Sequence, residues 1–271
     1  MFKKLAKLIT FCFCVSHGFA QLPSTTFTTA SSLSKGGIIA TSAGAGSIFL
    51  NHSGLSSINS FSLSVSAERR FGLSDLNSIN FSSAKRLDNN SVIAIGVGSY
   101  GLDALQQQLF LISYGRSLSE KLDLSVAFDL ARIDAEEFGS RNQIVVEVGS
   151  QYRLNNSISL GLIIKNPISN SINESLNTGS LIALGGTFAL DEKVNLYADI
   201  IRNDWDRWDV RAGLSYQLHE RLELSLGTSS GSNTINFGFR FNIQDNLSVD
   251  FAASRHRTLG ISPSIGVVFD K

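Results

Sequence analysis

The stretch "LDLSVAFDLA", Leu122 to Ala131, alternates with a period of two residues. Its apolar phase holds Leu122, Leu124, Val126, Phe128 and Leu130, and its other phase holds Asp123, Ser125, Ala127 and Asp129. Successive side chains of an extended chain point to opposite faces, so this stretch predicts a strand with one apolar and one polar face. The same alternation appears in "WDVRAGLSYQL" from Trp208, "TINFGFRFNI" from Thr234 and "LSVDFAAS" from Leu247. The sequence therefore predicts an all-β protein.

A five-residue pattern recurs between such strands. An aliphatic residue, three polar residues and a second aliphatic residue make up "LSEKL" at Leu118, "LNNSI" at Leu154, "LDEKV" at Leu190, "LHERL" at Leu218 and "IQDNL" at Ile243. The segment "LDNNS" at Leu87 departs from the pattern only in its last residue. The even spacing keeps both aliphatic residues on one face of a tight hairpin. The repeats predict six antiparallel hairpins.

Aromatic residues precede four of these turns at a constant distance. They stand two positions before the first aliphatic residue, at Tyr152, Phe188, Tyr216 and Phe241. The period of two places all four on the apolar face, at one height above the turns, as in the aromatic girdle of a membrane barrel. An exported soluble β-sandwich would also alternate and is the alternative. Strands of about ten residues with a nearly continuous apolar phase favour the membrane barrel.

The six hairpins supply twelve strands between Leu76 and His256. One more strand precedes them, "SFSLSVSAERR" from Ser60, and one follows, "GISPSIGVVF" from Gly260. The total predicts a closed transmembrane antiparallel β-barrel of 14 strands, whose closure leaves no unpaired edge in lipid. Longer connections are expected opposite the tight turns, near residues 101–107, 134–142, 166–179, 203–207 and 229–233.

The first twenty residues have the composition of a secretory signal peptide. Three lysines precede an apolar run from Leu8 to Val15, and the small residues Gly18 and Ala20 follow. The run is too short for a helix that spans a membrane. Cys12 and Cys14 both lie in this segment, so the exported chain is expected to have no thiols. Cleavage removes three of 23 basic residues and none of 23 acidic ones, which disfavours a nucleic-acid partner.

Catalytic and metal chemistry find little support in the sequence. Ser254, His256 and Asp250 lie along one predicted strand, whereas a catalytic triad needs three groups that converge. The four histidines are scattered, and "AGAGS" lacks the lysine of a phosphate-binding loop. We expect no enzyme activity, no cofactor and no metal site.

The segment before the first predicted strand carries a motif. Gly36 and Gly37 are followed by small residues and then by "SIFLNHSGL", Ser47 to Leu55, which contains Asn51, Gly54 and Leu55. This order resembles the N-terminal signature of FadL-like outer-membrane proteins, particularly the PorV and PorQ group of the Bacteroidetes, whose typical string is "NPAGLA". The chain departs from it at His52 and Ser53, which replace Pro and Ala.

The resemblance implies an outer-membrane location and an N-terminal plug inside the barrel. Ile48, Phe49 and Leu50 would pack against the barrel interior, and Asn51 with Gly54 would turn the chain into the first strand. The expected organisation is a signal peptide at residues 1–20, a plug segment at residues 21–58 and an outer-membrane barrel at residues 59–271.

The polar phase of the strands is expected to face the lumen. It is rich in glycine, at Gly96, Gly98, Gly115, Gly149, Gly161, Gly185, Gly213, Gly227 and Gly238. It also carries charges of both signs, at Asp123, Asp129, Glu147, Asp199, Asp209, Glu223 and Asp250 and at Arg153, Lys165, Arg211 and Arg240. The arginines could bind an anionic head group. We favour the interpretation that ion pairs involving Glu147, Arg153, Arg211, Arg240 and Asp250 hold the barrel shut.

Two functional hypotheses follow for a barrel surrounded by outer-membrane lipid. The first is a non-catalytic accessory or structural component of the envelope with secretion-system partners, since the resemblance implies a relation to type IX secretion. The second is a FadL-like channel for passive transport of a hydrophobic ligand. The predicted connections are short, the longest being "NPISNSINESLNTG" from Asn166, and this favours the accessory role.

Overall fold

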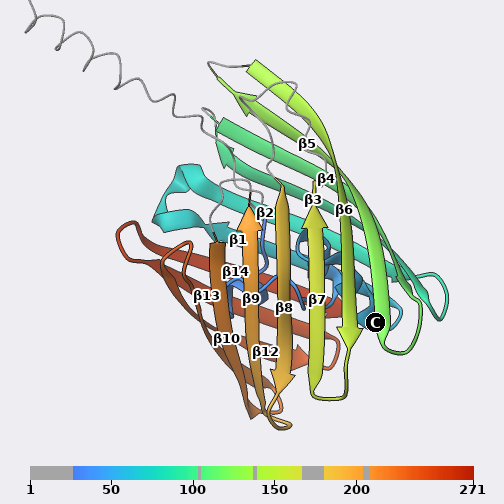
Figure 1. Ribbon diagram of the computed structural model, residues 1–271. Helices are drawn as coiled ribbons and strands as arrows, with labels where there is room; N and C mark the ends of the chain where they lie inside the picture. The colour runs from blue at the N-terminus through green and yellow to red at the C-terminus, as the bar shows by residue number, and fades with distance from the viewer. Residues whose placement is uncertain (1–26, 103–104, 137–138, 167–179, 204–207) are drawn as a thin grey trace, which may run out of the picture.

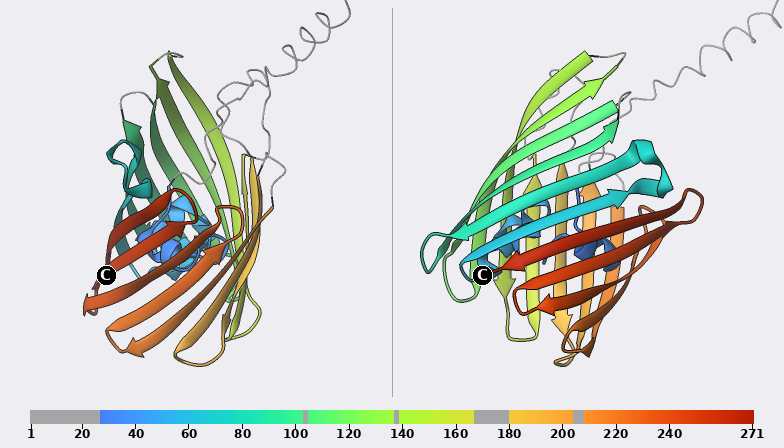
Figure 2. Two further views of the ribbon diagram at one scale, coloured as in Figure 1. Left: turned by 90° about the vertical axis from the view of Figure 1, so that its left-hand side faces the viewer. Right: turned by 180° about the vertical axis from the view of Figure 1, so that it is seen from behind.

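The chain forms a closed antiparallel β-barrel in a computed structural model that describes residues 27–102, 105–136, 139–166, 180–203 and 208–271 (Figures 1 and 2). Each strand pairs with its neighbours in sequence, and β1 pairs with β14 to close the barrel. The predicted barrel of 14 strands is therefore confirmed. The predicted signal peptide lies outside the described residues.

The strands have lengths from eight to 15 residues. They are β1 (Phe61–Arg69), β2 (Asn77–Arg86), β3 (Ser91–Leu102), β4 (Leu105–Ser117), β5 (Leu122–Ala135), β6 (Gly139–Arg153), β7 (Ile158–Lys165), β8 (Leu181–Ala189), β9 (Val194–Asn203), β10 (Trp208–His219), β11 (Leu222–Ser229), β12 (Thr234–Gln244), β13 (Leu247–His256) and β14 (Gly260–Asp270).

The five-residue repeats form the tight turns. In four repeats the first residue donates its backbone N–H to the carbonyl of the fifth, as from Leu118 to Leu122 at 2.8 Å and from Leu190 to Val194 at 2.9 Å. In the repeats at Leu218 and Ile243 the register shifts, and the second residue pairs with the fifth. The carbonyl of Lys271 accepts from the backbone N–H of Phe61, so β1 begins and β14 ends at this same tight-turn end of the barrel.

Two of the expected long connections are wrong. β3 reaches Leu102 and β4 begins at Leu105, while β5 and β6 are paired as far as Ala135 and Gly139. The outward side chains near these ends are polar and exposed, at Gln108, Arg132 and Asn142. The strands continue beyond the apolar band, so polarity here marks contact with water. Figure 1 shows β3 to β6 extending further at this end than β7 to β9.

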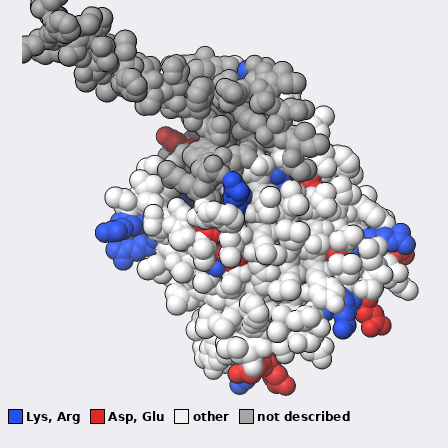
Figure 3. All heavy atoms as spheres, viewed as in Figure 1, with Lys and Arg blue, Asp and Glu red and all other residues white. Residues whose placement is uncertain are grey.

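The outer face carries the apolar phase of the strands. Phe110, Phe128 and Ile144 are among many large apolar side chains exposed on it. The four predicted girdle residues are exposed by 37 to 43%, at Tyr152, Phe188, Tyr216 and Phe241. Figure 3 shows few charged side chains between the two ends of the barrel face nearest the viewer. Lipid supplies no hydrogen-bond partners to a backbone, and a closed barrel pairs all of its strands internally. A closed barrel with this apolar band is therefore one that spans a membrane.

Residues 27–58, which we call the luminal segment, lie inside the barrel (Figure 2). The segment contains the helix α2 (Ala30–Ser34) and the 3-10 helices η1 (Ala45–Phe49) and η2 (His52–Ser57). Two further 3-10 turns, η3 (Arg70–Gly72) and η4 (Ser74–Leu76), connect β1 to β2. Within the described residues, no helix has the length and apolar character to cross a membrane.

The barrel register predicts opposite responses at two adjacent residues of β12. Phe237 is 55% exposed on the outer face, whereas Asn236 is buried on the inner face. Phe237→Arg should lower the free energy of unfolding in lipid vesicles by about 2–4 kcal/mol, because arginine enters the apolar band. Asn236→Ala is the control and should change the free energy of unfolding only slightly. Equal effects in urea titrations of the two variants would contradict the register.

Candidate functional site

The luminal segment contacts both halves of the barrel wall. α2 packs on β11 to β14, whereas η1 and η2 pack on β1 to β6. The apolar side chains form two clusters. One joins Ile48, Phe49 and Leu55 to inward residues of β2, β3 and β4, and the other joins Ile39 and Leu50 to Ile163, Leu181, Ala183 and Ile201. The segment is thus part of the core of the barrel.

Inward glycines allow the backbone of the segment to approach the wall. At nine inward glycines, an added Cβ would contact the luminal segment. They are Gly96, Gly98, Gly115, Gly149, Gly161, Gly213, Gly227, Gly238 and Gly266. At Gly161 a Cβ would stand 2.5 Å from the carbonyl carbon of Ala40. Gly185, predicted in the same set, instead lies against the Asp199 side chain. The glycine-rich phase of the strands therefore makes room for a chain that crosses the lumen.

Gly36 and Gly37 form the sharp turn after α2. Their φ angles are 86° and 77°, in the left-handed region that favours glycine. A Cβ at Gly36 would also stand 2.8 Å from the backbone oxygens of both Ala212 and Thr228. Both the conformation and the space at this turn therefore require glycine.

Charged wall residues bind the backbone of the segment. Asp199 Oδ2 accepts from the backbone N–H groups of Ile39 at 2.5 Å and Ala40 at 3.0 Å. Arg211 donates to the carbonyl of Gly37, and Arg86 donates to the carbonyl of Ile58 at 2.7 Å. Hydrogen bonds to charged groups contribute roughly 1.5–3 kcal/mol each. These four bonds therefore hold the segment by several kcal/mol in total.

Asn51 is the polar centre of the motif. Its side-chain oxygen accepts from Ser53 N–H at 3.2 Å, and its amide donates to the carbonyl of Ala40 at 2.6 Å and that of Ser150 at 3.1 Å. The residue therefore caps η2 and also ties the segment to β6. Gly54 lies within η2, close to the backbone of Ser42. The expected turn at Asn51 and Gly54 is thus a 3-10 helix that precedes β1.

His52, which departs from the family string, meets two charged wall residues. Glu147 Oε2 lies 2.9 Å from His52 Nε2 and 3.0 Å from Lys165 Nζ. Lys165 also donates to the carbonyl of Phe49 at 3.1 Å. His52 and Glu147 are buried, with 0% and 4% of their side chains exposed. This trio, from η2, β6 and β7, fastens the motif to the wall.

The three predicted arginines form ion pairs within the wall, whereas the buried Asp129 carboxylate has no ion-pair partner among the described residues. Arg153 Nη1 lies 2.6 Å from Asp123 Oδ2, and Arg211 Nε lies 2.7 Å from Asp209 Oδ2. Arg240 binds both carboxylate oxygens of Asp250, at 2.6 and 3.0 Å. These arginines are thus occupied by carboxylates of this chain, which fits ion pairing better than a site for an anionic ligand.

Three contacts of the segment could not be read from the sequence pattern. Lys35 forms an ion pair with Glu223 at 3.1 Å and lies over the ring of Tyr197. Gln151 donates to the carbonyl of Ser42 at 2.7 Å, and Arg86 binds the end of η2. The alternation placed Glu223 on the inward phase but gave no sign of what it faces.

Two cavities lie on opposite sides of the luminal segment. The long-loop cavity, about 220 Å³, has polar walls formed partly by Thr234, Ser254 and Ser262 and a floor that includes Ile39 and Leu50. The tight-turn cavity, about 460 Å³, is bounded by residues such as Ser57, Asn59, Asp245 and Asp270. The segment therefore divides the lumen.

This partition is one chain thick. Ile39 lines the long-loop cavity and its neighbour Ile38 lines the tight-turn cavity. Likewise, Thr28 lines the long-loop cavity and Thr29 lines the tight-turn cavity. Leu50 lines both cavities and is only 4% exposed.

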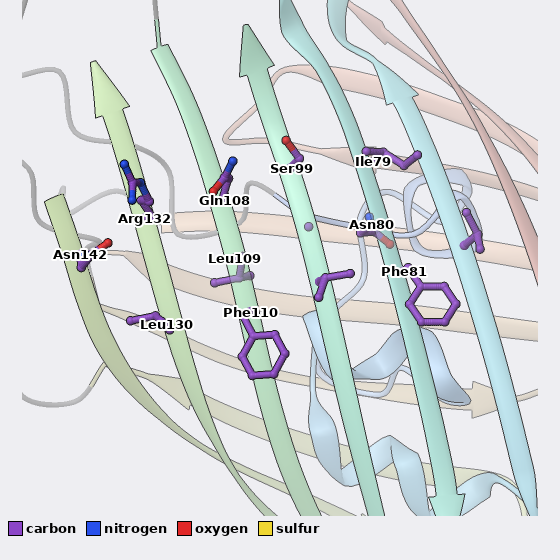
Figure 4. A pocket seen from close by; sticks show the side chains of 13 residues that line it. Ile79, Asn80, Phe81, Ser99, Gln108, Leu109, Phe110, Leu130, Arg132 and Asn142 are labelled. Atoms are coloured by element: carbon purple, nitrogen blue, oxygen red, sulfur yellow. The ribbon is translucent and has the colours of Figure 1, made fainter. Parts of the chain in front are cut away.

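A third hollow, of about 680 Å³, lies on the outer face over β1 to β6 (Figure 4). Phe81, Phe110 and Leu130 project there from β2, β4 and β5, with the luminal segment behind the sheet. At Gly98 the wall consists of backbone alone, and the ring of Phe27 lies against its inner side. Pairing of β3 with β2 and with β4 continues past this point in both directions. The wall is therefore closed beneath the hollow.

Among the described residues, no group of three His, Cys, Asp or Glu side chains is arranged to hold a metal ion. His256 stacks edge-on against Phe71 with ring centroids 5.8 Å apart, and its Nδ1 accepts from the backbone of Leu259. The geometry of the lumen is that of a partitioned compartment bounded by fixed polar contacts.

The fold and the divided lumen define a class, a membrane-spanning barrel with an internal segment. Among solved structures the chain is similar to a Pseudomonas aeruginosa FadL homologue, with a TM-score of 0.72 and 8% identity over 90% of this chain and 98% of the other. The Pseudomonas putida toluene transporter TodX has a TM-score of 0.67 and 12% identity, over 91% of this chain and 99% of the transporter. The Ralstonia pickettii toluene transporter TbuX has a TM-score of 0.64 and 12% identity, over 89% of this chain and 96% of the transporter.

No protein-family model matches the sequence, and no curated protein matches it significantly. At the identities found among solved structures, the likeness establishes a common fold. The fold of this chain is therefore that of FadL-like outer-membrane channels.

Glycine substitutions test the close contact between the segment and the wall. Gly161→Ala should lower the free energy of unfolding in lipid vesicles by about 1–3 kcal/mol, because the new methyl group overpacks the backbone of Ala40. The matched control is Gly115→Ala, whose Cβ would stand 3.7 Å from the nearest atom of the segment and should fit. If both variants unfold like the native protein in urea, the segment does not dock as described.

The buried trio should respond to loss of one partner. Lys165→Met should destabilise the protein by about 3–5 kcal/mol, because Glu147 keeps a buried charge without its lysine. Adding Glu147→Gln should recover part of this loss, which a double-mutant cycle of urea unfolding would measure. Lys121→Met, at an exposed turn, should have little effect. Independent, additive effects of the two trio substitutions would contradict the pairing.

Proposed function

We propose that this chain is an outer-membrane channel for the passive passage of hydrophobic small molecules. Its two cavities lie in line along a barrel whose fold is that of solved hydrocarbon channels and toluene transporters. The observation that carries the proposal is the long-loop cavity, which has an apolar floor formed by Leu33, Ile39, Phe49 and Leu50.

The size of that cavity supports a particular class of ligand. Its volume is about 220 Å³. An apolar cavity of about 150 Å³ is enough to bind benzene. A compact hydrophobic molecule with one aromatic ring would therefore fit over the floor, with its polar substituents toward the Ser and Thr side chains of the wall.

The luminal segment acts as the plug in this proposal. Residues 27–58 separate the two cavities, and the wall binds their backbone at several points. The segment is the part of the predicted plug, residues 21–58, that the structure describes. The exported chain, with its signal peptide removed, would begin just before it.

The comparisons favour a channel over the accessory role that we expected first. Solved structures with this fold include hydrocarbon channels and toluene transporters. The hypothesis of secretion-system partners keeps only the resemblance of the motif around Asn51 as support.

Deletion of the protein in its native host separates the two roles. We expect uptake of a labelled monoaromatic hydrocarbon at low concentration to fall, and the surface display of secreted proteins to stay normal. Complementation with the full chain should restore uptake. Normal uptake with impaired surface display would reject the channel and support the accessory role, and co-purification from outer membranes would then identify the partner.

A further inference from the structure

Leu50 occupies a singular place in the partition. Of the residues that the structure describes, it alone lines both the long-loop and the tight-turn cavity. Elsewhere in the segment, adjacent residues such as Ile38 and Ile39 face opposite cavities. At Leu50 a single residue therefore borders both compartments.

The backbone around Leu50 is fixed. Lys165 binds the carbonyl of Phe49 at 3.1 Å, and the side chain of Asn51 binds the wall carbonyls of Ser150 and Leu162 at 3.1 and 3.3 Å. Leu50 N–H itself donates to Ser47 at 2.9 Å. Movement at this point is thus movement of the leucine side chain, which can change rotamer without breaking any of these bonds.

The surroundings of the side chain are apolar. Leu50 packs with Ile39 of the segment and with Ile163, Leu181, Ala183 and Ile201 of β7, β8 and β9. A solute that displaced the leucine would contact these apolar side chains. Such contacts favour apolar molecules and disfavour polar ones.

A passage through the wall is less favourable. Beneath the outer hollow, β3 is paired with β2 from Ser78 to Arg86 and with β4 from Leu105 to Arg116. Opening the wall there would leave backbone groups unpaired in lipid. An axial passage at Leu50 displaces an apolar side chain and leaves the pairing of the strands intact.

We propose that Leu50 sets the size limit for hydrophobic solutes that pass along the barrel axis from one cavity to the other. The inference deepens the proposed channel function and depends on it. The side chain at this position determines the widest solute that passes, and the polar contacts around it keep the rest of the segment in place.

Substitutions of opposite size test the proposal in cells that lack the native gene and carry equal amounts of folded barrel, as measured by heat-modifiable mobility. Uptake is measured for two labelled solutes, toluene and a bulkier branched alkylbenzene. Leu50→Ala should raise the ratio of bulky to small solute several-fold, and Leu50→Phe should lower uptake of both. Glucose entry should not change in either variant.

The matched control is Ile48→Ala. Ile48 lies in the same segment and is as fully buried, but it packs in the other apolar cluster and lines neither cavity. Its uptake ratio should equal that of the native protein. A similar shift in Ile48→Ala, or no shift in Leu50→Ala, would overturn the role of Leu50.

A chemical block keeps the test decisive if a size variant fails to fold. Leu50→Cys, in a chain with Cys12 and Cys14 changed to Ser, places a smaller side chain at this position, and its thiol can be labelled after the barrel has folded. Reaction with a bulky methanethiosulfonate should abolish toluene uptake, whereas the same treatment of Ile48→Cys should not. Unchanged uptake after complete labelling at position 50 would reject the axial route. If native cells show no uptake that depends on this protein, the channel function itself fails, which is a distinct result.

Discussion

A chain that crosses the inside of a barrel must find hydrogen-bond partners for its backbone, because burial without them is costly. In this protein the wall supplies them. Asp199 accepts from two consecutive N–H groups, and Arg211, Lys165 and Arg86 donate to carbonyls of the segment. Glycines of the wall bring the two backbones close enough for such contacts. The position of the motif, the division of the lumen and the form of both cavities all follow from this docking.

The same constraint explains why charged residues line a lumen that we connect with apolar solutes. Asp199, Glu147, Arg211, Lys165 and Arg86 each have a partner in this chain, either a backbone group of the segment or an opposite charge in the wall. The Glu147 carboxylate, for example, lies between His52 and Lys165. Paired charges of this kind leave the floor of the long-loop cavity to Ile39, Phe49 and Leu50. The apolar floor and charged side chains thus border the same cavity, since Glu68, Arg70 and Arg211 also line it.

The barrel could be predicted from the sequence because membrane strands report their two faces directly. Alternation identified the outward residues, and the repeats at Leu118 and Leu190 marked the turns. The ends of β4 and β5 were misjudged near Gln106 and Asp134, since a strand that leaves the apolar band acquires the composition of a loop. Inward glycines were recognised as a set, but what they contact was not.

The site was harder to predict for a physical reason. Period-two alternation tells which side of the wall a residue faces and contains no information on what lies across the lumen. His52, Glu147 and Lys165 are distant in sequence and meet only because the segment is folded across the barrel. Leu50 was expected to pack inside, yet its shared position between two cavities depends on the path of the whole segment.

The single-chain thickness of the partition has an evolutionary consequence. Neighbouring codons, such as those for Ile38 and Ile39, encode surfaces of two different compartments. A point mutation can therefore alter the lining of one cavity without altering that of the other. The two linings can thus diverge independently while the wall stays unchanged.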